Sequence, residues 1–160
     1  VPAFKNATYW SNEKHWEWAV KPNAREKASF LKENILPIQE SGQLKFAKDG
    51  STEVNPKIIL KTVSGHTESM FIPHIKAGDK TIVYCADLFP SMAHIPLPYV
   101  MAYDTRPLLT LDEKKKFLDE AAANNYHLFF EHDRMVECCS IKQTERGVRE
   151  DRTFRLGELF

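Results

Sequence analysis

The pattern of hydrophobic and polar positions predicts a strand and a short helix at the start of the chain. Residues 3–10, Ala-Phe-Lys-Asn-Ala-Thr-Tyr-Trp, favour a strand. Ser11 follows this stretch and can cap a short helix that carries Trp16 and Trp18. Both tryptophans are expected to pack in the interior, because aromatic rings dominate core burial.

A second helix carries stronger signals. Asn23 is a suitable N-cap, and Glu26 stands three residues later, as in a capping box. We expect this helix to end near Pro37, because proline cannot donate the backbone hydrogen bond that continues a helix. Hydrophobic residues recur between these limits at helical spacing, at Phe30, Leu31 and Ile35.

From Gln43 onward the pattern changes to short extended segments separated by turns. Asp49-Gly50 predicts one turn, and residues 77–80, Ala-Gly-Asp-Lys, predict a hairpin between the two strands that flank them. The expected strands are residues 44–47, 57–63, 69–75 and 81–85.

A long loop and a well-signalled helix follow. Residues 89–107 are rich in proline, which excludes a long regular element and indicates a loop of the kind that often carries function. Thr110-Leu111-Asp112-Glu113 forms a capping box and predicts a helix to about Asn124. The charged run Lys114 to Lys116 is expected on its solvated face.

The end of the chain returns to strands. Residues 127–130 predict a buried strand that leads into Glu131-His132-Asp133. Residues 136–156 predict two or three strands with a turn near Arg146-Gly147. Because no repeat or linker divides the chain, residues 1–160 are expected to form one unit.

Composition narrows the classes of function. The chain has 160 residues, of which 42% are hydrophobic, and this is enough to bury a core without disulfide bonds. Its 22 basic and 22 acidic residues cancel, so no net field gathers nucleic acid or an anionic membrane. No apolar run is long enough to span a bilayer. We therefore expect no nucleic-acid partner and no membrane partner.

The cysteines indicate the redox state of the compartment, and the first residues indicate how the chain begins. Cys85, Cys138 and Cys139 form an odd set, which favours reduced thiols and a cytoplasmic location. The chain starts with Val-Pro-Ala-Phe, which contains neither an initiator methionine nor a signal peptide. We expect this start to be a cut.

Three polar residues stand just past the ends of strand-like segments, and they are His66, Asp87 and His132. Ligands gather at the carboxyl ends of strands in sheets flanked by helices, so these residues can converge on one point. Two imidazoles and a carboxylate suit zinc or another borderline divalent ion. A single histidine at such a position is more often a hydrogen-bonded structural residue, so the spacing alone leaves both interpretations open.

The sequence around these residues resembles a known family. The motifs Ser64-Gly65-His66-Thr67, Cys85-Ala86-Asp87-Leu88-Phe89 and Phe130-Glu131-His132-Asp133 together resemble the C-terminal half of the metallo-β-lactamase superfamily. The likeness extends over nearly the whole chain. It implies an α/β (α+β) fold that is half of an αββα sandwich, with a mainly antiparallel sheet and helices on one face.

The resemblance also implies a chemistry. A complete site of this family holds two divalent metal ions, with zinc expected first and manganese or iron as alternatives, and a metal-bound hydroxide attacks an ester, lactone or amide bond of a small molecule. Asp87 would be the catalytic residue that bridges the ions, and His66 and His132 would each bind one. Asp133 is a candidate to orient an imidazole. Some lactone-cleaving members carry a tyrosine where this chain has Pro90, so the resemblance implies a hydrolase in general.

The chain departs from the family in one large respect. The signature His-x-His-x-Asp-His, which supplies the other four ligands, is absent, and His15 has no histidine two residues away. Each metal would have two protein ligands here, whereas catalytic zinc usually takes three. We therefore expect a complementing N-terminal fragment or chain, and we expect this chain to be inactive without it. The complementing part would bind to an exposed apolar face of the sheet. The alternative is a non-catalytic binding or assembly module, and a homo-oligomer stays open.

Residues of the long loop receive simpler interpretations. His94 is a candidate for substrate binding, beside its interpretation as an ordinary loop histidine. Tyr103, Asp104 and Arg106 are expected to form a network that fixes the loop rather than to contact substrate.

Overall fold

The computed structural model describes residues 1–160 as a mixed α/β protein. The α-helices are α1 (Glu13–Val20), α2 (Lys32–Glu40) and α3 (Pro107–Ala123). The strands are β1 (Tyr9–Asn12), β2 (Leu44–Ala47), β3 (Ser51–Asn55), β4 (Ile58–Val63), β5 (Met70–Ala77), β6 (Lys80–Tyr84), β7 (His127–Phe129), β8 (Cys138–Thr144) and β9 (Gly147–Phe154).

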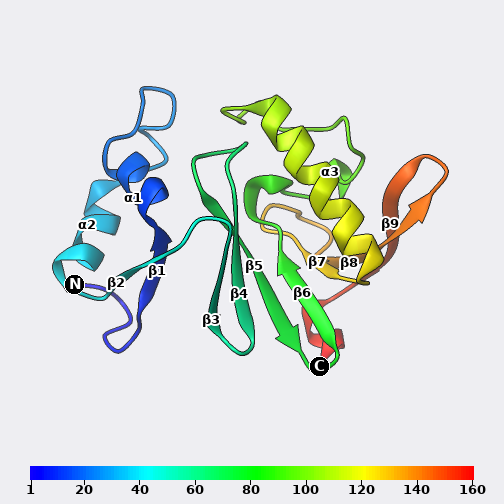
Figure 1. Ribbon diagram of the computed structural model, residues 1–160, viewed down its shortest axis with the longest axis horizontal. Helices are drawn as coiled ribbons and strands as arrows, with labels where there is room; N and C mark the ends of the chain where they lie inside the picture. Colours follow the sequence, from blue (N-terminus) through cyan, green and yellow to red (C-terminus); the bar gives the residue numbers. More distant parts are fainter.

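Two parts lie side by side in Figure 1. The larger part is a seven-stranded sheet in the order β3-β4-β5-β6-β7-β8-β9, with α3 packed against it. The smaller part contains α1, α2 and the parallel pair of β1 and β2. The expected α/β class and the mainly antiparallel sheet are confirmed.

Strand direction brings three strand ends to one edge of the large sheet. Neighbouring strands are antiparallel except β6 and β7, which are parallel. The connection between these two contains α3, the kind of crossover that a parallel pair requires. Because β4 is antiparallel to β5, and β5 to β6, the strands β4, β6 and β7 run in the same direction. Their carboxyl ends therefore lie at the same edge.

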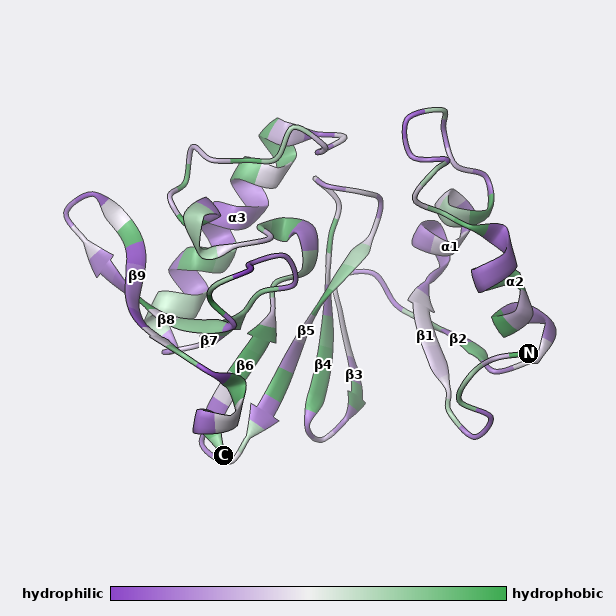
Figure 2. Cartoon of the chain, turned by 180° about the vertical axis from the view of Figure 1, so that it is seen from behind, coloured by the Kyte–Doolittle hydropathy of each residue, from purple (hydrophilic) through white to green (hydrophobic).

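The hydrophobic core lies between α3 and one face of this sheet. Phe117 and Leu118 of α3 belong to the same buried cluster as Val83 of β6 and Leu128 of β7. The strands β4 and β6 are largely hydrophobic in Figure 2. Each side chain of this size stabilises the fold by about 1.5–3 kcal/mol when it is fully buried, so this layer holds the strand ends in place.

The opposite face of the sheet carries a second apolar row. Residues paired directly across neighbouring strands point to the same face. The register aligns Tyr84 with Phe129, Phe129 with Cys138, and Cys138 with Phe154. The three aromatic residues of this row are only half-buried, whereas α3 packs on the other face.

The strand and helix at the N-terminus differ in detail from the prediction. β1 begins at Tyr9 rather than near residue 3. Asn12, and not Ser11, caps α1, because Oδ1 of Asn12 accepts a hydrogen bond from the backbone N–H of Lys14 at 2.9 Å. Ser11 pairs with Phe46 of β2. Asn12 also pairs in this sheet, with Ala47, and stays extended, so the first helical residue is Glu13 and the cap moves one residue along the chain.

The predicted position of the second helix is wrong. Asn23 Oδ1 accepts the backbone N–H of Glu26 as in a cap, but only a series of turns follows. The carboxylate of Glu26 accepts hydrogen bonds from Trp18 and Thr67. These tertiary contacts take the place of the capping box, and α2 starts later and continues through Pro37.

The start of α3 also differs from the prediction. The helix begins at Pro107, where proline is well tolerated because its missing N–H would have no partner in the first turn. Thr110 therefore lies inside the helix and is fully buried. The carboxylate of Glu113 binds the backbone of residues 64 and 65 instead of closing a capping box.

Lys114 contradicts the expected solvated face of α3. Its side chain is fully buried, and Nζ donates hydrogen bonds to three backbone carbonyls of the proline-rich loop, those of His94, Pro96 and Tyr99. The loop thus takes its shape from a buried lysine of the helix that follows it. The neighbouring Lys115 is exposed and pairs with Asp119, as a solvated face requires.

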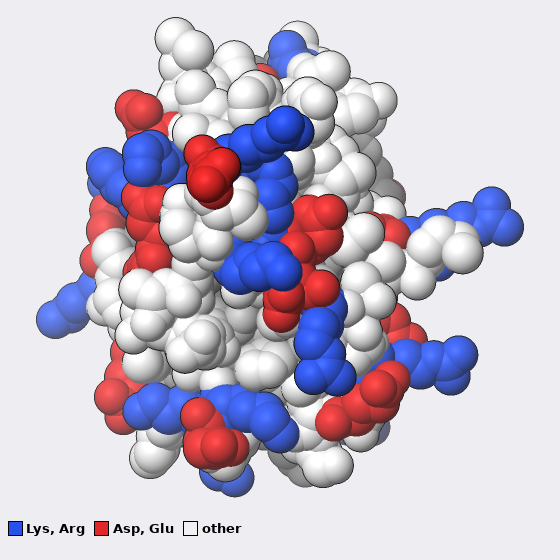
Figure 3. Space-filling model, turned by 90° about the vertical axis from the view of Figure 1, so that its right-hand side faces the viewer, with Lys and Arg blue, Asp and Glu red and all other residues white.

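The remaining strand predictions are confirmed to within a few residues, including the hairpin at Gly78 and the turn at Gly147. The edge strand β3 was not predicted, because Ser51–Asn55 is mostly polar and shows no hydrophobic run. On the face drawn in Figure 3, basic and acidic side chains are interspersed. No helix is both long enough and apolar enough to cross a membrane.

Candidate metal centre

The three residues singled out in the sequence meet at the edge where β4, β6 and β7 end. Nε2 of His66 lies 3.5 Å from Oδ2 of Asp87, and Nε2 of His132 lies 3.6 Å from Oδ1 of the same carboxylate. The Asp87 carboxylate therefore stands between two imidazoles and presents one oxygen to each. Both distances are too long for good hydrogen bonds.

Asp104 fixes the orientation of His66. Nδ1 of His66 lies 3.0 Å from Oδ1 of Asp104, whose side chain is fully buried. A proton on Nδ1 is then donated to Asp104, which leaves the lone pair of Nε2 directed at Asp87. Burial lowers the pKa of His66, but the hydrogen bond to Asp104 and the charges of Asp87 and Asp104 outweigh it, so the pKa is raised overall.

Three residues, Glu113, Thr105 and Thr110, contact the turn that carries His66 and fix its position. Glu113 accepts the backbone N–H groups of Ser64 and Gly65 at 2.7 and 2.9 Å. The hydroxyl of Thr105 donates to the carbonyl of His66 at 2.8 Å. Gly65 packs so closely on α3 that a Cβ would lie 2.3 Å from the backbone nitrogen of Thr110. The position of His66 is therefore set before any ligand binds.

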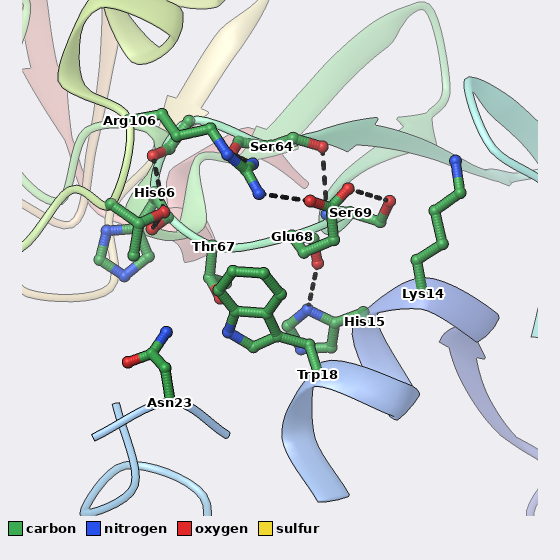
Figure 4. A network of polar contacts seen from close by, with 12 residues as sticks. Lys14, His15, Trp18, Asn23, Ser64, His66, Thr67, Glu68, Ser69 and Arg106 are labelled. Atoms are coloured by element: carbon green, nitrogen blue, oxygen red, sulfur yellow. Dashed lines mark hydrogen bonds and ion pairs between the residues drawn. The ribbon is translucent and has the colours of Figure 1, made fainter. Parts of the chain in front are cut away.

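A second set of contacts ties this turn to the N-terminal part (Figure 4). Arg106 donates to the carbonyl of Ser64 and to the carboxylate of Glu68. The guanidinium of Arg106 also lies 5.5 Å from the centre of a Trp18 ring. Nδ1 of His15 contacts the carbonyl of Glu68 at 2.7 Å. The predicted loop-fixing network is thus present for Asp104 and Arg106, whereas Tyr103 is largely exposed.

Asp87 sits on a strained piece of backbone. Ala86 has φ +44°, in the left-handed region that favours glycine. The carbonyl of Pro90 accepts the backbone N–H of His132 at 3.1 Å, which brings the end of β7 beside Asp87.

The structure also brings residues to this place that the sequence did not single out. A cleft of about 720 Å³ opens over Asp87, and its walls include Glu131, His15 and Arg25. Glu131 directly precedes His132, and this adjacency was the one available signal for it. His15 and Arg25 reach the cleft from the N-terminal part, and nothing in their local sequence indicates this.

Asp133 does not have the role expected for it, whereas His94 lies outside this cleft and its role in substrate binding stays a prediction. His94 does not line this cleft, and its Nδ1 lies 2.8 Å from the hydroxyl of Ser91. Asp133 orients no imidazole, because it accepts the backbone N–H groups of Met92, Met135 and Val136. Burial would raise the pKa of Asp133, but these three donors lower it overall. Asp104 fills the orienting role instead.

The donor set fits a divalent ion. Zinc binds histidine nitrogen and carboxylate oxygen at about 2.0–2.2 Å, so two ligand atoms in a tetrahedral shell lie about 3.3–3.5 Å apart. The separations of 3.5 and 3.6 Å between Asp87 and the two imidazoles match this spacing. Asp104 behind His66 is the carboxylate partner that a metal-binding histidine usually has.

Comparison with known proteins supports the fold. No protein-family model and no curated protein matches the chain. Among solved structures, one described as a "probable metal-dependent hydrolase" from Staphylococcus aureus superposes with a TM-score of 0.81 at 24% identity. The dizinc quorum-quenching lactonase AidC gives 0.69 at 22%, and the hydrolase AbOPH of the beta lactamase superfamily gives 0.77 at 20%.

The chain matches only part of each of these proteins. The matches cover 94%, 94% and 97% of this chain but 53%, 56% and 58% of the Staphylococcus aureus protein, AidC and AbOPH. The chain therefore has the fold of about half of a metallo-β-lactamase-type hydrolase, as the resemblance of its motifs implied.

Proposed function

We propose that this chain supplies one half of a metal-dependent hydrolase that cleaves ester, lactone or amide bonds in small molecules. The observation that carries the proposal is the Asp87 carboxylate, which presents one oxygen to His66 and the other to His132 at 3.5 and 3.6 Å. Three chain segments converge on this arrangement, and Asp104 fixes it from behind.

The residues have distinct roles in this proposal. A bound divalent ion lowers the pKa of water and polarises the carbonyl under attack, and zinc, manganese or iron suits the nitrogen and oxygen donors. His66 and His132 would each hold one ion. Asp87, which presents one carboxylate oxygen to each histidine, would bind both ions. Asp104 keeps the Nδ1 proton of His66 in place, so that Nε2 remains free to bind.

A complementing half would explain three features of this chain, namely its length, an apolar face of its sheet and a short parallel strand pair. The Staphylococcus aureus hydrolase is about twice as long as the segment that this chain matches. The half-buried aromatic row on the sheet face opposite α3 suits a second sheet, which packs about 10 Å away in a sandwich. The pair β1 and β2 is also short for a parallel sheet, a type that is normally buried on both faces. One partner, which is either a separate chain or the remainder of the same one, would account for the unmatched length, cover the half-buried aromatic row and extend the short parallel pair.

The test is reconstitution of activity. The chain is mixed with the part of the Staphylococcus aureus hydrolase that lies outside the matched 53%, in the presence of Zn²⁺ or Mn²⁺. Hydrolysis of p-nitrophenyl acetate and of an N-acyl homoserine lactone is then followed. We expect activity from the mixture, none from either half, and loss with His66→Ala or Asp87→Asn. Asp112→Asn, an exposed change on α3, serves as the matched control.

Two outcomes contradict the proposal. If the halves associate but the mixture hydrolyses neither substrate with any of these metals, the chain is a binding or assembly module that uses its apolar face. If the activity survives Asp87→Asn unchanged, the reaction takes place elsewhere.

A further inference from the structure

The two oxygens of Asp87 face different surroundings. Oδ2 faces His66, whose other nitrogen is occupied by Asp104. Oδ1 faces His132, and the Glu131 carboxylate lies on the same side, with Oε1 at 3.9 Å from Nε2 of His132. One ligand atom from each of Asp87, Glu131 and His132 falls within a single group whose members are at most 4.8 Å apart.

The charges in this group are not compensated by basic side chains. Asp87 and Glu131 form ion pairs only with histidines, and no lysine or arginine pairs with either carboxylate. Two neighbouring carboxylates repel each other, and a divalent cation is the partner that removes this repulsion while it also binds an imidazole.

The geometry needs only a small closure to form a metal shell. Ligand atoms of a tetrahedral zinc site are about 3.3–3.5 Å apart, so separations of up to 4.8 Å in this group must shrink by at most about 1.5 Å. The side chains of Glu131 and His132 are 39% and 59% exposed, which leaves room for both groups to approach Asp87. Asp87 is more buried, with 27% of its side chain exposed.

We propose that the two metal positions of this chain are unequal. The position formed by Asp87, Glu131 and His132 has three protein ligands and binds one divalent cation without any partner. The position formed by His66 and Asp87 has two ligands and fills only when a complementing half supplies more. This inference deepens the proposed function and rests on it for the second position, but binding of the first ion is measured without hydrolysis.

The experiment is a titration of the 160-residue chain alone. Zn²⁺ is competed against a chromophoric chelator to obtain affinity, and Co²⁺ absorption reports the ligand shell. We expect one ion per chain. Glu131→Gln and His132→Ala should each weaken binding by at least the 10–100-fold that loss of a supporting partner costs a metal site. His66→Ala should leave the affinity within about threefold, since His66 belongs to the other position.

The test includes one control variant, and two results would contradict the inference. Glu145→Gln, in the exposed turn before β9, should not change the affinity. If the chain binds no zinc in this titration, the inference is overturned, although reconstituted hydrolysis can still support the proposed function. If His66→Ala weakens binding as much as His132→Ala while Glu131→Gln does not, the ion lies between the histidines and the assignment of Glu131 is wrong.

Discussion

Nδ1 of His66 lies 3.0 Å from Oδ1 of Asp104, a residue whose side chain is fully buried and 38 positions further along the chain. A buried carboxylate is costly unless it has a charged or hydrogen-bonding partner. Here the ring of His66 is that partner, and the same contact aims Nε2 at Asp87. The packing of the long loop and the geometry of the candidate metal centre therefore depend on each other.

The first prediction concerns the protonation of His66. In the metal-free chain, Asp104→Asn removes a charge and a charge-assisted hydrogen bond that favour the imidazolium. The lowering of the pKa by burial is then opposed by fewer interactions, so we expect the pKa of His66 to fall. Titration of the His66 ring by NMR measures this. Asp112→Asn should leave the pKa unchanged, and an unchanged value in Asp104→Asn would show that Asp104 does not act on the ring.

The second prediction concerns the dependence of stability on pH. The folded-state pKa of His66 is raised above the ordinary 6.5, so the folded chain binds its proton more tightly than the unfolded chain does. The resulting stabilisation is fully present below pH 6.5 and disappears as the pH rises through the folded-state pKa. Urea unfolding with a chelator present should show that the advantage of the unchanged chain over His66→Gln shrinks as the pH is raised above 6.5. A constant difference would contradict this.

The third prediction concerns the carboxylate of Glu113, which accepts two adjacent N–H groups of the turn before His66. Glu113→Gln offers one acceptor and one donor, so one backbone N–H loses its partner. We expect the free energy of unfolding to fall by about 1–3 kcal/mol. Chemical denaturation measures the loss. Glu145→Gln, which changes the same group on the surface, should stay within about 0.5 kcal/mol.

The fourth prediction concerns Gly65, where an added methyl group would overlap Thr110 of α3. Gly65→Ala should destabilise the chain by about 1–3 kcal/mol through overpacking, and it should displace His66. Gly157→Ala adds the same methyl group where no atom lies within 4 Å. Thermal unfolding of the two variants separates the effects, and equal transition temperatures would mean that the turn yields at little cost.

The fifth prediction concerns the buried ammonium of Lys114, which binds three carbonyls of the proline-rich loop. Lys114→Met keeps the length of the side chain but leaves these acceptors without their donor. We expect a loss of about 3 kcal/mol and faster proteolysis within residues 89–106. Lys115→Met, at an exposed neighbour, is the control, and similar proteolysis of both variants would show that Lys114 does not anchor the loop.

Prediction from the sequence succeeded where one pattern dominated its segment. The turn residues 77–80, Ala-Gly-Asp-Lys, predicted the hairpin of β5 and β6, and the apolar stretch at residues 127–130 predicted β7. It failed where a distant partner competed with local signals. Glu26 bonds to Thr67 and Trp18 instead of capping a helix, and Lys114 turns inward to bind a loop that local sequence does not reveal.

The sequence by itself determined which chemical groups follow which strands, because hydrophobic runs and the polar residues that end them are local properties. It therefore singled out His66, Asp87 and His132 as candidates, and the structure brings these three residues together. Tertiary structure alone decided that Asp104 orients His66, that Glu131 joins Asp87 and His132, and that His15 and Arg25 reach the same cleft. Some of these contacts join residues that are far apart in the chain, and the others depend on the direction of a side chain. Neither property is fixed until β4, β6 and β7 pack under α3 with their carboxyl ends at one edge.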